Sequence, residues 1–114
     1  VKFAKMPMAS LENKAGKFVK PTDESGKAAL ASVKLPSDLR AWLPDPDGAD
    51  SYPIATYTWM LFYKKYDDSK KAAALREVVK YCVTDGQKMS EKLGYIALPE
   101  NVVQAVSKAA ENIQ

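Results

Sequence analysis

The chain has 114 residues, 17 of them basic and 14 acidic, which gives a net charge of +3. Its 46% hydrophobic and 27% charged residues are typical of one globular domain. The basic residues are spread along the chain, which argues against a nucleic-acid surface, and Lys64-Lys65 and Lys70-Lys71 are interpreted as a solvated face. No apolar run approaches the roughly 18 residues of a membrane-spanning helix.

The residue types that carry most catalysis and metal binding are scarce. Cys82 is the only cysteine, so no disulfide can form within the chain, and histidine is absent. Without histidine, no Ser/His/Asp or Cys/His set can be assembled. We therefore expect no enzyme and no cofactor, and we expect Cys82 to be a buried, inert thiol.

The first third of the chain predicts a hairpin followed by a helix. Residues 8–11 and 17–19 are short extended candidates, and Gly16 between them suits a tight turn that needs positive φ. Thr22 is a good N-cap for a helix over residues 23–33. The apolar side of that helix would consist of Ala28, Ala29, Leu30 and Val33.

Residues 35–50 are expected to be irregular, because prolines interrupt them. Trp42 and Leu43 would anchor this loop to a core. Asp45-Pro46-Asp47-Gly48 has strong turn chemistry. The spacing of Asp45, Asp47 and Asp50 does not match a calcium loop of the EF-hand type, so a solvated turn is favoured over a metal site.

Residues 54–63 are the most apolar stretch and contain no charge, glycine or proline. Their two alternating faces are Ala55, Tyr57, Trp59, Leu61 and Tyr63, and Ile54, Thr56, Thr58, Met60 and Phe62. Because both faces are largely apolar, the stretch predicts a β-strand covered on both sides, as in an α/β sheet. Tyr52, Tyr57 and Trp59 are interpreted as core residues rather than as a stacking surface for a ligand.

Helical segments are predicted after this strand. Asp67-Asp68-Ser69 would cap the first, whose apolar face consists of Leu75, Val78, Val79, Cys82 and Val83. Thr84 and Gln87 have the spacing of a capping box, so a second helix is expected to begin there and to end before Gly94. Pro99 would open a last helix, which buries Val102, Val103, Val106 and Ala109.

A family resemblance follows from this order of elements. Its residues are YPIATYTWMLFYKKYDDSKKAAALREVVKYCVTDGQKMSEKLGYIALPENVVQAV, and the specific marks are YPI, TDGQ and LGYIALPENVV. This stretch resembles the C-terminal part of the PstS family, the phosphate-binding proteins of phosphate ABC transporters, and ASLENKAGKFVKPT is similar to that family's hairpin. The resemblance covers nearly all of this chain but only about the last third of a family member. Residues 1–4 read as mid-chain sequence, so we expect a fragment or a processed piece.

The resemblance implies an α/β fold that is part of a two-lobe periplasmic-binding-protein (type II) architecture, incomplete in 114 residues. Residues 1–51 would be the C-terminal part of the second lobe, with the hairpin, the helix and the Pro-rich loop. Residues 52–114 would cross the hinge at Tyr52, Pro53 and Ile54 and return to the first lobe with the central strand and the last helices.

The function that the resemblance implies is non-enzymatic. Such a protein captures phosphate, or a related oxyanion such as sulfate, in the periplasm or another extracytoplasmic space, and serves a membrane ABC permease. The family's anion ligands precede Val1, and no residue here matches their motifs, so we assign no ligand-binding, catalytic or metal-binding residue. The nearest anion-binding loop, Thr84-Asp85-Gly86, carries an aspartate that would repel an anion.

Other interpretations remain open. The chain would be a stand-alone protein–protein interaction module if its aromatic-rich strand were exposed, because such a strand is a pairing edge. A fragment would instead associate with its complementary fragment or with a swapped copy. An enzyme ranks third, since no residue recommends it.

Overall fold

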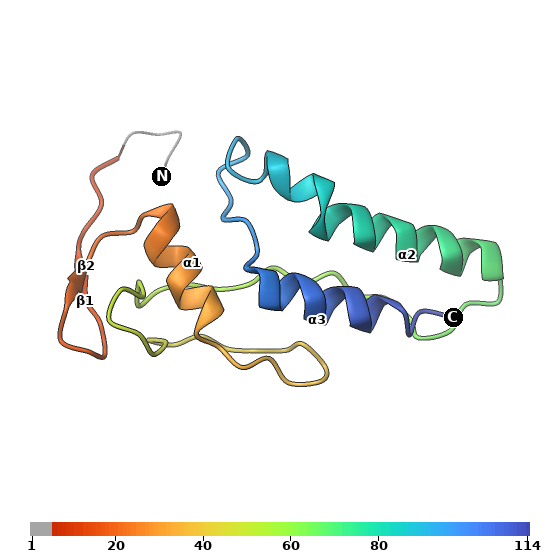
Figure 1. Ribbon diagram of the computed structural model, residues 1–114, viewed down its shortest axis with the longest axis horizontal. Helices are drawn as coiled ribbons and strands as arrows, with labels where there is room; N and C mark the ends of the chain where they lie inside the picture. Colours follow the sequence, from red (N-terminus) through yellow and green to blue (C-terminus); the bar gives the residue numbers. More distant parts are fainter. Residues whose placement is uncertain (1–5) are drawn as a thin grey trace.

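The computed structural model describes residues 6–114, so the interpretation of residues 1–4 as mid-chain sequence lies outside the described part. The element order is β1 (Leu11–Glu12), β2 (Phe18–Val19), α1 (Asp23–Ala31), α2 (Ser69–Val83), the 3₁₀ helix η1 (Asp85–Met89) and α3 (Glu100–Ala110). Figure 1 shows α2 and α3 side by side and antiparallel, with the hairpin at the opposite end of the body. Within residues 6–114, no helix has both the length and the hydrophobicity needed to cross a membrane.

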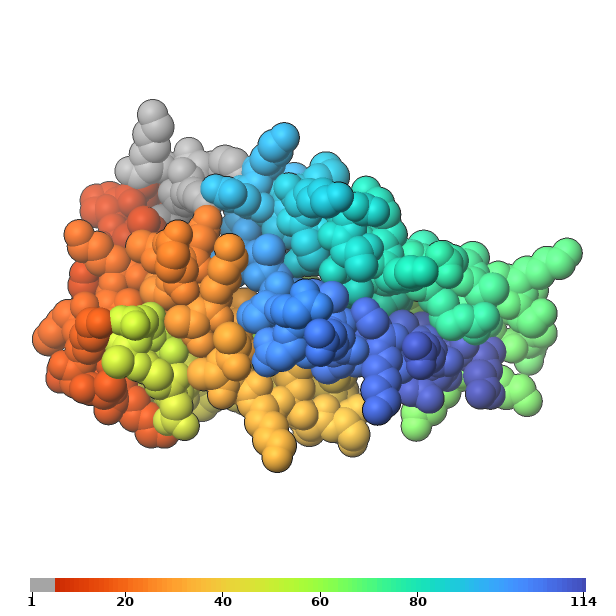
Figure 2. Space-filling view, viewed as in Figure 1, coloured from red at the N-terminus to blue at the C-terminus, as the bar shows by residue number. Residues whose placement is uncertain are grey.

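The body is elongated and thin, with extents of 50 × 29 × 18 Å. Its radius of gyration is 16.1 Å, whereas a compact domain of this length has about 13 Å. Its accessible surface is 8501 Å², which is about 2,300 Å² more than expected for a self-contained domain of this mass. Figure 2 shows the same elongated outline with its side chains in place. The chain therefore leaves unusually much of its surface in solvent.

The N-terminal hairpin confirms the turn predicted at Gly16. β1 and β2 pair antiparallel, with Leu11 opposite Val19. Gly16 adopts a φ of 75° in the connecting turn. Glycine takes this left-handed conformation without the steric cost that a Cβ would add, so the residue type fits its place.

Helix α1 begins as predicted but ends two residues early, at Ala31. Thr22 and Ser25 form a reciprocal capping box, in which each side chain accepts a hydrogen bond from the other residue's backbone N–H. A Cβ added at Gly26 would come within 2.1 Å of Ile96 Cδ1. The glycine therefore allows α1 to approach the stretch that leads into α3.

The predicted strand over residues 54–63 is wrong for this structure. Apart from an isolated bridge between Pro44 and Ile54, the stretch pairs with no other strand, and the sheet formed by residues 6–114 is the two-stranded hairpin alone. A strand is stabilised by neighbours that pair with its backbone N–H and C=O groups. The described chain supplies no such neighbours, so the expected α/β sheet is not formed.

Two apolar clusters stabilise the body. The first lies between α1, the Pro-rich loop and the start of α3, and its buried members are Leu30, Ala41, Leu43, Tyr57 and Val102. The second lies between α2 and the end of α3, with Ala72, Val79, Ala110 and Ile113. Val106 packs against both clusters, so α3 joins the two ends of the molecule.

Helix α2 has the predicted cap and part of the predicted buried face. The Asp68 carboxylate accepts a hydrogen bond from the Lys70 N–H at 2.8 Å. The buried residues are Ala72, Val79 and Val83, while Val78 is exposed and Cys82 is only half-buried. The expectation of a buried Cys82 was therefore wrong, because the side of α2 that faces α3 is rotated away from it.

The predicted capping box at Thr84 and Gln87 is also wrong. The Thr84 hydroxyl donates back to the Lys80 carbonyl at 2.7 Å, and no side chain caps η1. Gln87 instead joins two segments, since its Nε2 donates to the Cys82 carbonyl at 2.6 Å and its Oε1 accepts from the Leu98 N–H at 2.7 Å. Only the short 3₁₀ helix η1 forms here.

The end of this region and the start of α3 follow the prediction closely. Gly94 has a φ of 79°, as expected for a residue that ends a helical segment. Pro99 is the residue just before α3 rather than its first residue. Val102 is buried, and the other predicted apolar positions are half-buried: Val103, Val106 and Ala109.

Candidate functional site

The three predicted hinge residues, Tyr52, Pro53 and Ile54, lie where the bonding of the backbone changes. The Tyr52 N–H donates to the Ser25 carbonyl of α1, and the Pro53 carbonyl accepts from the Asp45 N–H, both at 3.1 Å. Ile54 is 72% exposed. The backbone is thus bonded to the first part of the molecule up to the bridge at Ile54, and beyond it the contacts with that part are made by side chains, among them those of Tyr57 and Trp59.

The unpaired segment, residues 56–62, follows directly. None of its backbone N–H groups donates a hydrogen bond to residues 6–114. The chain on both sides is anchored, because Asp45 bonds to Pro53 and Gln114 bonds to both Lys64 and Tyr66. The segment therefore lies between two anchored ends, and its backbone N–H groups have no partner within the part of the chain that the structure describes.

Most side chains of the unpaired segment are exposed, apart from the buried Tyr57 and the half-buried Phe62. Tyr57 is 8% exposed, and its hydroxyl donates to the Leu30 carbonyl at 2.6 Å. Burial raises the pKa of the Tyr57 hydroxyl. Leu61, by contrast, is 92% exposed, and Met60 is also exposed. Leu61 lies on the same predicted face as Tyr57, so that face is covered near Tyr57 and open to solvent at Leu61, while Phe62 of the other face packs against the second cluster.

The tryptophans lie differently from the prediction. Leu43 is buried and anchors the loop as expected, but Trp42 is 84% exposed. Its ring packs against Trp59 with 6.1 Å between centroids, and Trp59 Nε1 donates to the Leu39 carbonyl at 3.0 Å. Of the three aromatics assigned to the core, which were Tyr52, Tyr57 and Trp59, only Tyr57 is buried.

The aspartates before the hinge contact the hairpin turn rather than one another. Asp45 accepts from the Lys14 N–H at 3.0 Å, Asp47 pairs with Lys14 Nζ at 3.0 Å, and Asp50 pairs with Lys17. The hydrogen bond to Asp47, with the attraction of its charge, raises the pKa of Lys14. Within residues 6–114, no group of three or more acidic, cysteine or histidine residues is placed to hold a metal ion.

The loop that most resembles an anion-binding turn keeps its negative charge. The hydrogen bond from Lys88, together with the Lys88 charge, lowers the pKa of Asp85, so this carboxylate is ionised at neutral pH. An anion at Thr84-Asp85-Gly86 would meet that charge. The lysine pairs at residues 64–65 and 70–71 are exposed, as the solvated-face interpretation expects.

The sequence of the chain is similar to those of known phosphate-binding proteins. No family model matches the chain. The chain is 39% identical, over 96% of its length, to the phosphate-binding protein PstS of Methanocaldococcus jannaschii, of which it covers 32%. It is 30% identical to PstS of Xylella fastidiosa (90% of this chain, 29% of the relative) and 31% identical to PstS of Pasteurella multocida (86% and 29%).

These relatives are binding proteins by name, and the chain spans about a third of the length of the relatives it matches. The chain is thus similar to one segment of a solute-binding protein rather than to a whole one. The similarity to a segment of PstS proteins confirms the resemblance predicted from YPI, TDGQ and LGYIALPENVV.

Proposed function

We propose that this chain is the C-terminal structural segment of a phosphate-binding protein that supplies an ABC transporter. The observation that carries the proposal is the match to PstS relatives over almost the whole chain. The role is non-enzymatic capture of phosphate or a related oxyanion. The protein works in the periplasm or another extracytoplasmic space, and its partner is a membrane ABC permease.

In this proposal two lobes close on the anion. Residues 1–51 complete the second lobe, and residues 52–114 return to the first lobe through one hinge crossing at Tyr52, Pro53 and Ile54. The change of backbone bonding at Ile54 supports this assignment. The first apolar cluster contains residues from both proposed lobes, so the lobes would meet beside the hinge.

The anion ligands are proposed to lie in the rest of such a protein. The unpaired segment and the large exposed surface support the idea that this chain contributes structure rather than ligands. A completed sheet would pair the free N–H groups of residues 56–62 and cover Leu61.

The proposal is tested by Pro53→Gly in the longer protein. Glycine removes the fixed φ of proline, so we expect faster or wider lobe motion and a changed affinity for inorganic phosphate. The melting temperature should change little. Pro36→Gly, in an exposed part of the Pro-rich loop of residues 35–50, is the matched control. Unchanged affinity and closure rate in Pro53→Gly would contradict the hinge assignment.

A second candidate is a stand-alone interaction module. The observation that favours it is the exposure of apolar side chains such as Met60 and Leu61, next to the surface pair Trp42–Trp59. An uncovered strand of this kind adds to a partner's sheet edge. Analytical ultracentrifugation of this chain separates the candidates. A folded monomer favours the module, whereas a swapped dimer, or folding only with the complementary fragment, favours the segment.

A further inference from the structure

We infer that Asn13 is a positioning residue for the hinge and that it fixes the peptide plane from which the hinge departs. The inference rests on the proposed function, because it concerns the same hinge. Asn13 lies in the hairpin turn, 38 positions before Ser51, yet its amide reaches the Ser51 carbonyl. Asn13 is 5% exposed, so its polar atoms depend on partners within the protein.

The oxygen of the Asn13 side chain organises the turn. Oδ1 accepts from the Ala15 N–H and the Lys17 N–H, both at 3.1 Å. The backbone groups of Asn13 are also bonded, since its N–H donates to the Lys17 carbonyl and its carbonyl accepts from the Gly16 N–H. These bonds hold the side chain in one orientation and aim its amide away from the turn.

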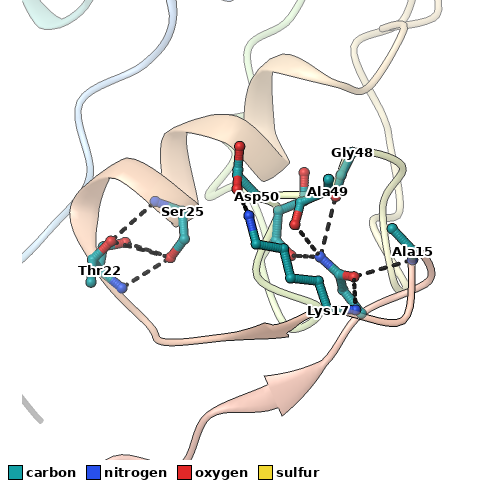
Figure 3. Close-up of polar contacts among 9 residues, drawn as sticks. Ala15, Lys17, Thr22, Ser25, Gly48, Ala49 and Asp50 are labelled. Carbon is teal, nitrogen blue, oxygen red and sulfur yellow. Dashed lines mark hydrogen bonds and ion pairs between the residues drawn. The ribbon is translucent and has the colours of Figure 1, made fainter.

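The amide nitrogen of Asn13 holds the loop before the hinge. Nδ2 lies 2.9 Å from the Ala49 carbonyl, 3.1 Å from the Ser51 carbonyl and 3.3 Å from the Gly48 carbonyl. Its two protons must be shared among these three acceptors. Figure 3 shows Ala15 and Lys17 of the turn facing Gly48, Ala49 and Asp50 of the loop.

The bond to Ser51 matters most, because it acts on a peptide unit that is held from both sides. The Ser51 carbonyl and the Tyr52 N–H belong to one peptide plane. Asn13 donates to its carbonyl, and its N–H donates to the Ser25 carbonyl of α1 at 3.1 Å. The plane is thus fixed between the hairpin turn and α1, at the entrance to the proposed hinge.

The ion pairs around this contact do not hold the plane. Lys14 pairs with Asp47 and Lys17 with Asp50, and all four side chains are more than half exposed. Exposed pairs of this kind contribute little to stability. They therefore provide a control in which the hairpin and the loop lose an attraction while the Asn13 amide keeps its carbonyl partners.

The experiment separates the two halves of the Asn13 side chain. Asn13→Asp keeps an acceptor for Ala15 and Lys17 but replaces the amide donor with an oxygen that repels the loop carbonyls. In this chain, we expect the Tyr52 amide to exchange its hydrogen roughly tenfold faster or more, as loss of a buried hydrogen bond allows. Exchange at Ala15 and Lys17 should stay close to that of the unaltered chain.

Lys14→Ala is the matched control, and it should leave exchange at Tyr52 unchanged. If the buried carboxylate of Asn13→Asp prevents folding, Asn13→Ser provides the same measurement, because its side chain is small and uncharged. Unchanged exchange at Tyr52 in the Asn13 variant that folds overturns the inference.

In the longer protein, Asn13→Asp should change the rate of closure on inorganic phosphate. If Pro53→Gly changes that rate and Asn13→Asp does not, the inference about Asn13 fails while the proposed hinge stands. If neither variant changes it, the proposed hinge fails.

Discussion

The loop before the hinge and the unpaired segment after it are adjacent in sequence but opposite in character. In the loop, backbone carbonyls accept hydrogen bonds from the Asn13 amide, and two carboxylates pair with lysines of the hairpin. In the unpaired segment, the backbone N–H groups of residues 56–62 find none among residues 6–114. The loop satisfies itself within this chain, whereas the segment has the sequence of a buried strand without its surroundings.

The difference shows which of the two regions finds its hydrogen-bonding and packing partners within this chain. A polar loop folds onto a nearby hairpin because its groups are satisfied by specific short contacts. An apolar strand is satisfied only by neighbouring strands and covering layers, which are built by other segments. The excess accessible surface of about 2,300 Å² is consistent with such missing layers.

The largest expected effect comes from comparing two leucines of the same size. Leu30 is 4% exposed in the first apolar cluster, so Leu30→Ala should lower the free energy of unfolding of this chain by about 2–5 kcal/mol. Leu61 is 92% exposed, and Leu61→Ala should change it by less than about 0.5 kcal/mol. Urea denaturation measures both. Equal losses would mean that Leu61 is covered in solution.

A smaller effect is expected where η1 meets the stretch before α3. Gln87→Ala removes a donor to the Cys82 carbonyl and an acceptor for the Leu98 N–H, so it should cost about 1–3 kcal/mol. Thr84→Ala is the control, because this exposed hydroxyl only bonds back to Lys80. Thermal unfolding of both variants decides the point. A larger loss of stability for Thr84→Ala would instead support the capping box predicted from the sequence.

The smallest effect is a pH dependence at Tyr57, the buried tyrosine of the segment. Burial raises the pKa of Tyr57 above its ordinary value of 10.0, so the unfolded chain loses this proton first as the pH rises. Stability from this group is present below pH 10 and falls as the pH rises through the folded pKa. Tyr57→Phe should therefore lose less stability between neutral and strongly alkaline pH than the unaltered chain. Parallel curves for the two chains would contradict the burial of this hydroxyl.

The features that the sequence predicts correctly are local. Gly16, Thr22, Asp68 and Gly94 adopt the turns and caps that their residue types favour, because these depend on a few neighbouring residues. The irregular loop and its anchor Leu43 also follow from local chemistry and hydrophobicity.

The features that the sequence misses depend on distant partners. The strand pattern of residues 54–63 identifies apolar faces but cannot supply the strands that would pair with them. Thr84 has capping-box spacing, but its partner Gln87 bonds across to Leu98 instead. The role of Asn13 was also missed, and its signal was weak, since an asparagine three residues before Gly16 indicates a turn but not a contact with Ser51.

Hydrogen exchange of the amides of residues 56–62 tests the central claim most directly. We predict rapid exchange in the dilute chain, and strong protection in the longer protein once neighbouring strands pair with the segment. Protection of these amides in a monomer of this chain would contradict the account, because the segment would then be complete on its own.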